Sequence, residues 1–317
     1  MINAGRIVAK RDKSGLCTVD EAHSLGQVSL PRVPSAHRRS DDDSRSIFDG
    51  GVDRTRPGGR RIGHMKDTFF YPSDGESKFF NKLNEITTRW PHDVRHYLDL
   101  FPTYVSRRSF IRQLAHYELF KLTVELPGHY ADFGVYYGKS FFSWHKFIEV
   151  LTPTATHKKV IGFDSFAGFP SLHEEDGVHD ANVQKEVGGL SSENFLDEFR
   201  ELLKLHNEDG VLPTGRGQIV EGDISKTLPE WLEQNPESRF CLINVDVDIY
   251  EPTKTILEHC WDRLVPGGVL ILDEYATSKW PGETRAWDDF ARKNGIVAPV
   301  KRFPWANAPG GYIVKGA

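Results

Sequence analysis

The chain has 317 residues, of which 38% are hydrophobic and 12% aromatic, and its formal net charge is −5. These values predict one large domain, alone or with an extension, and the mild acidity disfavours nucleic acid as a general partner. Three cysteines are too few for a disulfide framework and favour a reducing compartment. No apolar run approaches the roughly 20 residues that a membrane span needs, and no signal-peptide core follows Met1. We therefore expect a soluble, cytoplasmic protein without a membrane partner.

Residues 1–66 differ from the rest of the chain. They contain 13 Lys/Arg and 8 Asp/Glu, a single aromatic residue (Phe48) and no apolar period. Such a segment buries too little apolar surface to offset its ordering entropy, which predicts a disordered tail. A basic arm or a targeting peptide is the functional alternative to a tail without specific function. Met65 stands where globular composition begins, so a translation start or a cloning junction there is a further hypothesis.

The domain is expected over residues 67–317, and its pattern changes twice. Residues 67–125 are expected to form a helical and aromatic cap, in which the segment 69–101 would cover the active site or contact a second subunit of a homo-oligomer. Apolar residues at helical spacing then give way to alternating strand and helix patterns. Strands are predicted over 130–135, 159–163, 217–221, 239–245, 269–272, 300–303 and 311–314. This order predicts an α/β fold with a mostly parallel seven-stranded sheet, an antiparallel edge and helices on both faces.

Two of the predicted strands end in paired acids. Asp246 and Asp248 follow one strand, in Asn244-Val-Asp-Val-Asp-Ile-Tyr250, and Asp273 and Glu274 follow the next. The carboxyl ends of strands are where open α/β sheets bind ligands. Because clustered carboxylates repel one another, they indicate a hard metal ion or a role in proton transfer. Capping of helices and ion pairs to nearby Lys or Arg are the structural alternatives.

A glycine-rich turn follows the first strand, in Asp132-Phe-Gly-Val-Tyr-Tyr-Gly-Lys-Ser140. Gly134 and Gly138 allow close approach of the backbone to a ligand, and the next helix begins at Ser140 with free amide groups. The spacing disfavours a dinucleotide site, and Asp132 suits a cationic group. Asp164 and Ser165 end the second strand, where a ribose is usually held, and Asp223 follows the third, where an adenine would lie. Together these strand ends predict a nucleoside with a positive centre, such as S-adenosylmethionine.

Several segments occur in an order that is similar to the macrocin O-methyltransferase family of class I S-adenosylmethionine-dependent enzymes. They are Leu126–Ser140, Phe163–Pro170, Asp246–Thr253, Pro266–Gly268, Asp273–Tyr275 and Trp280–Phe290. The resemblance covers roughly residues 100 to 315. It implies a Rossmann-like fold and methylation of a hydroxyl on a sugar or glycosylated small molecule in natural product biosynthesis. It also implies dependence on Mg²⁺ or another divalent cation.

The resemblance also assigns roles to residues. Asp246, Asp273 and Glu274 match the metal ligands of the family, and Asp248 matches its general base. Gly134, Asp164 and Asp223 match cofactor contacts. The chain departs from the family pattern in having Tyr137-Gly-Lys139 in place of Arg-Gly-Gly, and Glu274 where a second Asp is common.

Two other functions stay open on the sequence. The loop from Asp132 to Ser140 also resembles that of catechol-type O-methyltransferases, which act on phenolic natural products. A non-catalytic S-adenosylmethionine-binding protein is the second alternative, although it would not need four acids at adjacent strand ends. The polar loop that holds His173 and His179 is more typical of a solvated segment or a mobile lid over residues 168–192 than of a second metal site. Three tryptophans are as consistent with a sugar pocket as with a core position: Trp280, Trp287 and Trp305.

Overall fold

A computed structural model describes residues 74–178, 184–212 and 215–316. Contacts divide the chain into two units, residues 1–63 and 64–317, and the first unit lies outside the described residues. The disorder predicted for residues 1–66, and the hypothesis about Met65, therefore stay predictions. The same holds for Cys17, while Cys241 and Cys260 are free thiols in the core. None of the helices within the described ranges has the length and apolar character needed to cross a membrane.

In the described part of the chain, four helices come first, over the segment predicted to be helical and aromatic: α1 (Asp74–Arg89), α2 (Val94–Asp99), α3 (Phe101–Tyr104) and α4 (Arg107–Lys121). Neither α2 nor α3 contains a buried residue. In contrast, α4 buries one stripe, from Ala115 to Phe120, and packs against α5. Its start is defined by Ser106, whose hydroxyl accepts a hydrogen bond from the backbone N–H of Ser109 (3.1 Å).

The sheet has the strand order β3-β2-β1-β4-β5-β6, and its last pair is antiparallel while the others are parallel. The strands are β1 (His129–Phe133), β2 (Val160–Asp164), β3 (Gly217–Glu221), β4 (Phe240–Val245), β5 (Leu264–Leu272) and β6 (Gly311–Val314). This confirms the predicted α/β class and antiparallel edge. The α-helices between and after the parallel strands are α5 (Lys139–Leu151), α6 (Leu196–Glu208), α7 (Ile224–Gln234), α8 (Tyr250–Cys260) and α9 (Pro281–Lys293). Short 3₁₀ turns at Glu174–Asp176 and Glu193–Phe195 lie in the connection from β2 to α6.

The seventh strand, expected over residues 300–303, is not confirmed in the described part of the chain. Lys301 forms a single antiparallel bridge with Tyr312, in place of a continuous ladder. Pro299 and Pro304 bracket this segment, and proline lacks the N–H that a ladder requires. The bridge still continues the antiparallel pairing at the β6 edge.

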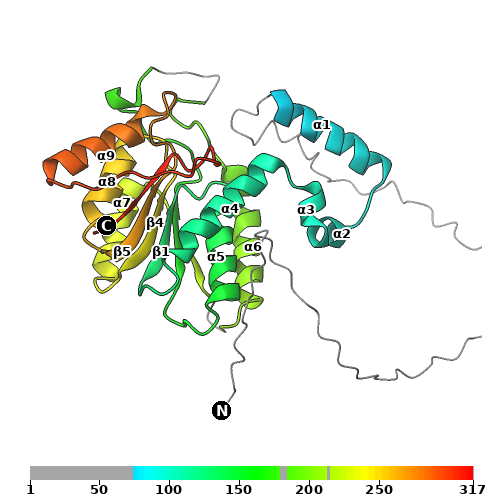
Figure 1. Ribbon diagram of the computed structural model, residues 1–317, viewed down its shortest axis with the longest axis horizontal. Helices are drawn as coiled ribbons and strands as arrows, with labels where there is room; N and C mark the ends of the chain where they lie inside the picture. Colours follow the sequence, from blue (N-terminus) through cyan, green and yellow to red (C-terminus); the bar gives the residue numbers. More distant parts are fainter. Residues whose placement is uncertain (1–73, 179–183, 213–214, 317) are drawn as a thin grey trace, which may run out of the picture. The chain divides into compact units, whose positions relative to one another are not determined.

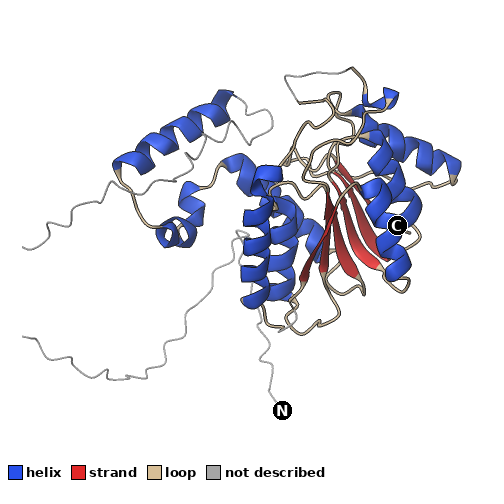
Figure 2. Cartoon of the chain, turned by 180° about the vertical axis from the view of Figure 1, so that it is seen from behind, coloured by secondary structure: helices blue, strands red, loops and turns tan. Residues whose placement is uncertain are grey.

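Apolar residues cover both faces of the sheet, which is the pattern of a buried parallel sheet. Alternate side chains of each strand point to opposite faces, so two cores form. Ala131 and Phe133 of β1 pack with α7, α8 and α9, whereas Tyr130 packs with α4, α5 and α6. Helices accordingly lie on both sides of the strands (Figures 1 and 2).

Gly134, directly after β1, fits a space that no other residue can enter. Its φ is +84°, and a Cβ built there would lie 1.8 Å from the carbonyl oxygen of Asp246. Replacement would therefore force apart the ends of β1 and β4 and also impose a left-handed backbone on a side chain. The close approach fixes the distance between the two loops that leave these neighbouring strands.

We expect Gly134→Ala to lower the free energy of unfolding by at least about 3 kcal/mol, because it combines a backbone clash with conformational strain. Gly295→Ala is the matched control, since Gly295 also has a positive φ (+62°) but nothing within 4 Å of an added Cβ. Its cost should be only about 1 kcal/mol. Urea denaturation of both variants measures the difference. Equal losses would show that the approach to Asp246 is not a constraint.

Candidate active site

The carboxyl ends of β1, β4 and β5 bring the predicted functional segments to one edge of the sheet. The order of the parallel strands reverses between β1 and β4, which is the point where such sheets bind ligands. The backbone N–H of Asp246 donates to the Phe133 carbonyl (2.9 Å), and that of Asp273 donates to the Val245 carbonyl (3.0 Å). The acids that follow β4 and β5 therefore start from paired backbone positions beside the glycine loop, residues 132–140.

Asp132, the first residue of the glycine loop, holds this loop in place through hydrogen bonds of its side chain. Its side chain is fully buried. It accepts hydrogen bonds from the Ser140 hydroxyl (2.9 Å), the Trp144 indole N–H (3.2 Å) and the Asn244 amide (2.8 Å). Burial raises the pKa of Asp132 to about 6, although the three donors oppose this rise. Asp132 and Ser140, both predicted cofactor contacts, are thus hydrogen-bonded to each other, and direct contact with the cofactor stays a prediction.

Asp164 ties the end of β2 to the glycine loop. Its two carboxylate oxygens accept the backbone N–H groups of Tyr136 and Phe166, each at 2.7 Å. Burial raises its pKa above the ordinary value, and the backbone donors oppose this. Ser165 closes the same turn, because its hydroxyl donates to the Gly168 carbonyl (2.9 Å). The carboxylate oxygens of the half-buried Asp164 have further lone pairs, which can accept the predicted hydrogen bonds from a ribose.

The other two predicted cofactor residues also have structural roles. Asp223 caps α7 by accepting the Ser225 N–H (3.0 Å), and it forms an ion pair with Lys226 (3.1 Å). Gly138 precedes α5 with a φ of +79°, and a Cβ there would lie 2.7 Å from the Phe142 ring. Helix packing therefore requires glycine at this position whether or not a ligand is bound.

Each of the four loops that leave β1, β2, β4 and β5 contains a non-glycine residue with positive φ. These residues are Tyr136 (51°), Phe166 (55°), Asp248 (63°) and Ala276 (61°). Left-handed conformations are unfavourable for residues with a Cβ, and such residues cluster at functional sites. Two further residues of this kind, Gln184 (53°) and Leu190 (59°), lie in the connection from β2 to α6, so four of the six among the described residues lie at the edge that holds the candidate site.

Asp246, Asp248, Asp273 and Glu274, here called the acidic cluster, meet a guanidinium from outside the sheet. Arg112 of α4 donates from Nη2 to Oδ2 of Asp246 (2.6 Å) and to Oδ1 of Asp273 (2.9 Å). Ion pairs with the carboxylates more than offset the effect of burial, so the pKa of Arg112 is raised. One nitrogen atom thereby links the ends of two strands.

Burial and mutual repulsion raise the pKa values of three acids of the cluster, although the positive charge of Arg112 and, at Glu274, that of Arg108 oppose the rise. Burial and the charge of Asp273 raise the pKa of Asp246 well above its ordinary value, against the opposing charge of Arg112. Burial and the charge of Glu274 do the same for Asp248. The pKa of Glu274 rises to about 7, mainly through burial and the charge of Asp273. A site in which buried carboxyl groups repel one another attracts a cation or a proton.

Two residues of this edge were missed in the sequence. Glu283 of α9 is fully buried; its Oε1 accepts the backbone N–H of Glu274 (2.9 Å), and its Oε2 has no hydrogen-bond partner among the described residues. Arg112 is the other. A helical signal existed for both, since Arg112 lies three and four positions before the buried Ala115 and His116. Glu283 likewise shares a stripe with the buried residues that follow it in α9.

The donor chemistry of the acidic cluster fits a hard divalent cation, which prefers carboxylate oxygens. The unpartnered Oε2 of Glu283 agrees with this fit. Within the described ranges, however, no three His, Cys, Asp or Glu side chains are arranged to hold a metal ion. The ion pairs of Arg112 with Asp246 and Asp273 engage one oxygen of each carboxylate.

Other predicted residues lie apart from the acidic cluster. Trp280 and Trp287 are buried core residues, at 2% and 3% exposure, so the structure does not place them on an open sugar pocket; Trp305 is 46% exposed. His173 stacks on Tyr250 with ring centroids 4.6 Å apart. His179 lies outside the described residues, so a second metal site that includes it cannot be described.

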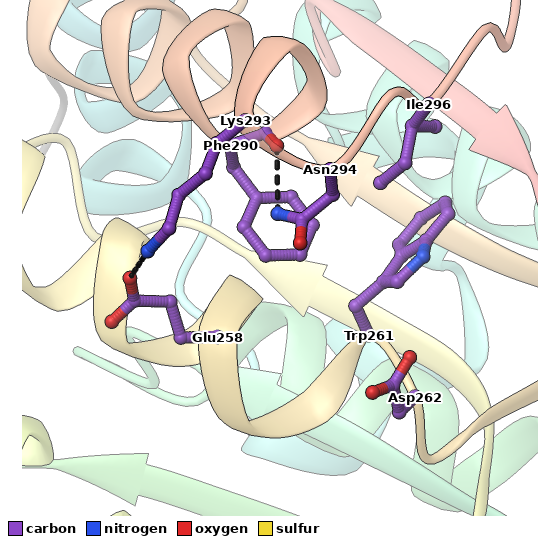
Figure 3. A pocket seen from close by; sticks show the side chains of 7 residues that line it. All are labelled: Glu258, Trp261, Asp262, Phe290, Lys293, Asn294 and Ile296. Atoms are coloured by element: carbon purple, nitrogen blue, oxygen red, sulfur yellow. Dashed lines mark hydrogen bonds and ion pairs between the residues drawn. The ribbon is translucent and has the colours of Figure 1, made fainter.

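A cavity of about 460 Å³ lies between the carboxyl-terminal ends of α8 and α9 (Figure 3). It is lined by Glu258, Trp261, Asp262, Phe290, Lys293, Asn294 and Ile296. An ion pair between Lys293 and Glu258 (3.2 Å) borders it. Because α8 and α9 start at the carboxyl edge of the sheet and run back, their ends lie at the opposite edge. This cavity is therefore separate from the candidate active site.

The strand order, the glycine loop at the β1–β4 reversal and the antiparallel edge together define a class I methyltransferase fold. A family model described as macrocin-O-methyltransferase (TylF) matches residues 108–308. The chain belongs to this family. The resemblance inferred from the sequence motifs is thereby confirmed.

Relatives of known function are sugar-related methyltransferases. The chain is 28% identical over 187 residues to the 8-demethyl-8-(2,3-dimethoxy-alpha-L-rhamnosyl)-tetracenomycin-C 4'-O-methyltransferase of Streptomyces olivaceus, across 55% of this chain and 62% of that protein. It is 27% identical over 145 residues to the mycinamicin III 3''-O-methyltransferase of Micromonospora griseorubida, across 42% and 49%. The matched part thus spans less than two thirds of both relatives.

Solved structures agree with the fold. A crystal structure of the calicheamicin methyltransferase CalS11 has a TM-score of 0.71 and 28% identity, and the match covers 78% of this chain and 96% of that one. An apo structure of the same enzyme, described as a TDP-rhamnose 3'-O-methyltransferase, has a TM-score of 0.64 and 27% identity, with coverage of 78% and 98%. The O-methyltransferase NovP, at 20% identity and a TM-score of 0.51 over 65% of this chain and 79% of that one, shares the fold.

The buried Asp132 should make stability depend on pH. Because its pKa is raised in the folded protein, the unfolded chain releases this proton first as pH rises, and folding is then disfavoured. Compared with Asp132→Asn, the wild type should lose on the order of 3 kcal/mol of unfolding free energy between about pH 4 and 6. Urea titrations across this range measure the difference, and Asp262→Asn controls for loss of an exposed carboxylate. A constant difference would contradict the proposed cost of ionising Asp132.

Proposed function

We propose that the protein is an S-adenosylmethionine-dependent O-methyltransferase that acts on a hydroxyl of a sugar or glycosylated small molecule. The observation that carries this proposal is the meeting of the glycine loop after β1 with the acidic cluster after β4 and β5. A methyl donor and an acceptor hydroxyl must lie side by side for transfer. The β1–β4 reversal is the place where this fold offers both.

The sugar acceptor is supported by the family and by the names of its relatives. The tetracenomycin relative is described as acting on a rhamnosyl compound, and CalS11 as acting on TDP-rhamnose. The acid-rich edge also suits a polyhydroxylated acceptor, since carboxylates accept hydrogen bonds from hydroxyl groups. We infer an acceptor with neighbouring oxygen atoms, such as a vicinal diol.

Asp248 is the proposed general base. Methyl transfer forms a bond between the acceptor oxygen and the methyl carbon and breaks the sulfur–methyl bond of the cofactor, while the hydroxyl proton moves to a base. A carboxylate in the acidic cluster can accept this proton. Burial and neighbouring acids raise the pKa of Asp248, which increases its affinity for the proton. Its left-handed backbone (φ 63°) directs the chain sharply after β4.

Asp246, Asp273 and Glu274 are the residues that would hold Mg²⁺ or another divalent cation. When bound, such an ion lowers the pKa of a coordinated hydroxyl and fixes its position. Asp246 and Asp273 are already drawn towards a common cation, since both contact Arg112. Glu274 is oriented by its backbone, whose N–H is held by Glu283 (2.9 Å). Its carboxyl, with a pKa of about 7, has a high affinity for positive charge.

Transfer of a labelled methyl group from S-adenosylmethionine to a panel of rhamnosides, TDP-rhamnose and catechols tests the proposal, with Mg²⁺ or with a chelator. We expect sugar methylation that the chelator abolishes. Labelling of catechols alone would favour the catechol-type alternative. Cofactor binding without transfer to any compound would favour a non-catalytic role. Near-normal rates with the chelator would refute metal assistance.

Asp248→Asn should lower kcat by about 100-fold or more, because loss of a general base typically costs 10²–10⁴. Binding of S-adenosylmethionine, measured by calorimetry, should stay within about threefold, since the cofactor is expected nearer β1 and β2. Asp262→Asn, at the opposite edge of the sheet, is the matched control and should keep full activity. A kcat of Asp248→Asn close to that of the wild type would remove Asp248 from the mechanism.

A further inference from the structure

Arg112 occupies the centre of the acidic cluster. A single nitrogen, Nη2, lies 2.6 Å from Oδ2 of Asp246 and 2.9 Å from Oδ1 of Asp273. The side chains of Arg112 and Asp246 are each 23% exposed and that of Asp273 is 2% exposed. Water therefore screens this three-way ion pair only in part. The contact joins residues 134 and 161 positions apart in the chain, so it depends on the tertiary fold.

The guanidinium contacts only part of the acidic cluster. Arg112 donates hydrogen bonds to Asp246 and Asp273, whereas Asp248 and Glu274 lie one or two positions further along the chain. Glu283, fully buried behind the backbone of Glu274, retains an oxygen without a partner among the described residues. This unpartnered carboxyl oxygen is a further acceptor at the same edge that Arg112 does not satisfy.

Arg112 and a divalent cation cannot both hold these two oxygens. A magnesium ion needs its oxygen ligands at about 2.1 Å, and the two oxygens concerned are already bound to one nitrogen. An ion between them would lie in the space that Nη2 fills, and two positive centres in a half-buried site repel each other strongly. Binding of a metal through these two oxygens therefore requires the guanidinium to leave.

We propose that Arg112 is a positioning residue, which holds Asp246 and Asp273 together in the metal-free protein and is displaced from them when a divalent cation binds. This inference rests on the metal dependence in the proposed function. Arg112 substitutes for the missing charge and so keeps the two strand ends from separating. It also weakens metal binding, because its ion pairs must break first.

Displacement of the Arg112 side chain would remove contacts that hold α4. Arg112 lies in the second turn of α4, before the stripe from Ala115 to Phe120 that is anchored in the core. Before α4, the helices α2 and α3 have no buried residues. The Arg112 ion pairs thus hold the start of α4 together with the hydrogen bond from Ser143 to Gln113 (2.9 Å), and its first turns should loosen when the pairs break. Metal binding would in this way alter a segment outside the sheet.

Direct titration of the full chain with Mn²⁺ tests the proposal, because electron paramagnetic resonance reports this ion without any turnover. Arg112→Met removes the charge and keeps the length of the side chain. We expect its Kd for Mn²⁺ to be at least tenfold lower than that of the wild type. Arg107→Met, which removes an exposed charge from the first turn of the same helix, should stay within twofold. An unchanged or higher Kd for Arg112→Met would overturn the proposal.

Hydrogen exchange of the wild type gives a second test that needs no variant, should Arg112→Met fail to fold. Saturating Mn²⁺ should speed exchange of the hydrogen-bonded amides of residues 110–113 at least fivefold, and a chelator should reverse this. Unchanged or slower exchange would overturn the displacement. If the wild type and Arg112→Met both bind no Mn²⁺, the metal part of the proposed function fails as well. If both bind with the same Kd, only the role of Arg112 fails.

Discussion

Mutual repulsion among carboxylates is the constraint on which the candidate site depends. Parallel strands β4 and β5 each end in a pair of acids, and their register brings the acids to the same edge. Concentrated negative charge of this kind opposes folding unless a cation or protons compensate it. In this structure Arg112 supplies one charge across two strands. The site can therefore be viewed as a region whose charge balance is left for a ligand to complete.

A second set of contacts gives the cofactor side its shape. Asp132 and Asp164, both predicted to contact a ligand, form hydrogen bonds that join the glycine loop to the ends of β4 and β2. These two roles are compatible, because a loop whose backbone is already fixed loses little entropy when a ligand binds. The loop is thus preorganised from the β1 side and the β2 side, and Gly134 sets its distance from β4.

The sequence predicted the parts of the fold that follow local periodicity. Strand ends with acids, the glycine turn and the alternation of strands and helices all leave a signal within a few residues. Arg112 was missed because its contacts, with Asp246 and Asp273, are 134 and 161 positions away in the chain. Glu283 was missed because its position on a helix does not indicate that it accepts the backbone N–H of Glu274. The burial of Trp280 was undecided for the same reason, since aromatic residues suit both a core and a pocket. The seventh strand, predicted over residues 300–303, was not confirmed, because a proline on each side limits its pairing.

The left-handed residues Tyr136, Phe166, Asp248 and Ala276 have a consequence for the stability of the whole domain. Each costs roughly 1 kcal/mol relative to glycine, a large sum for a fold that is stable by only about 5–15 kcal/mol. Glycine at these positions would relieve the strain and would also free the loops to adopt other shapes. Resistance to heat and precision of the loops are therefore opposed at this edge, and a more thermostable form of the protein is better sought by changes elsewhere.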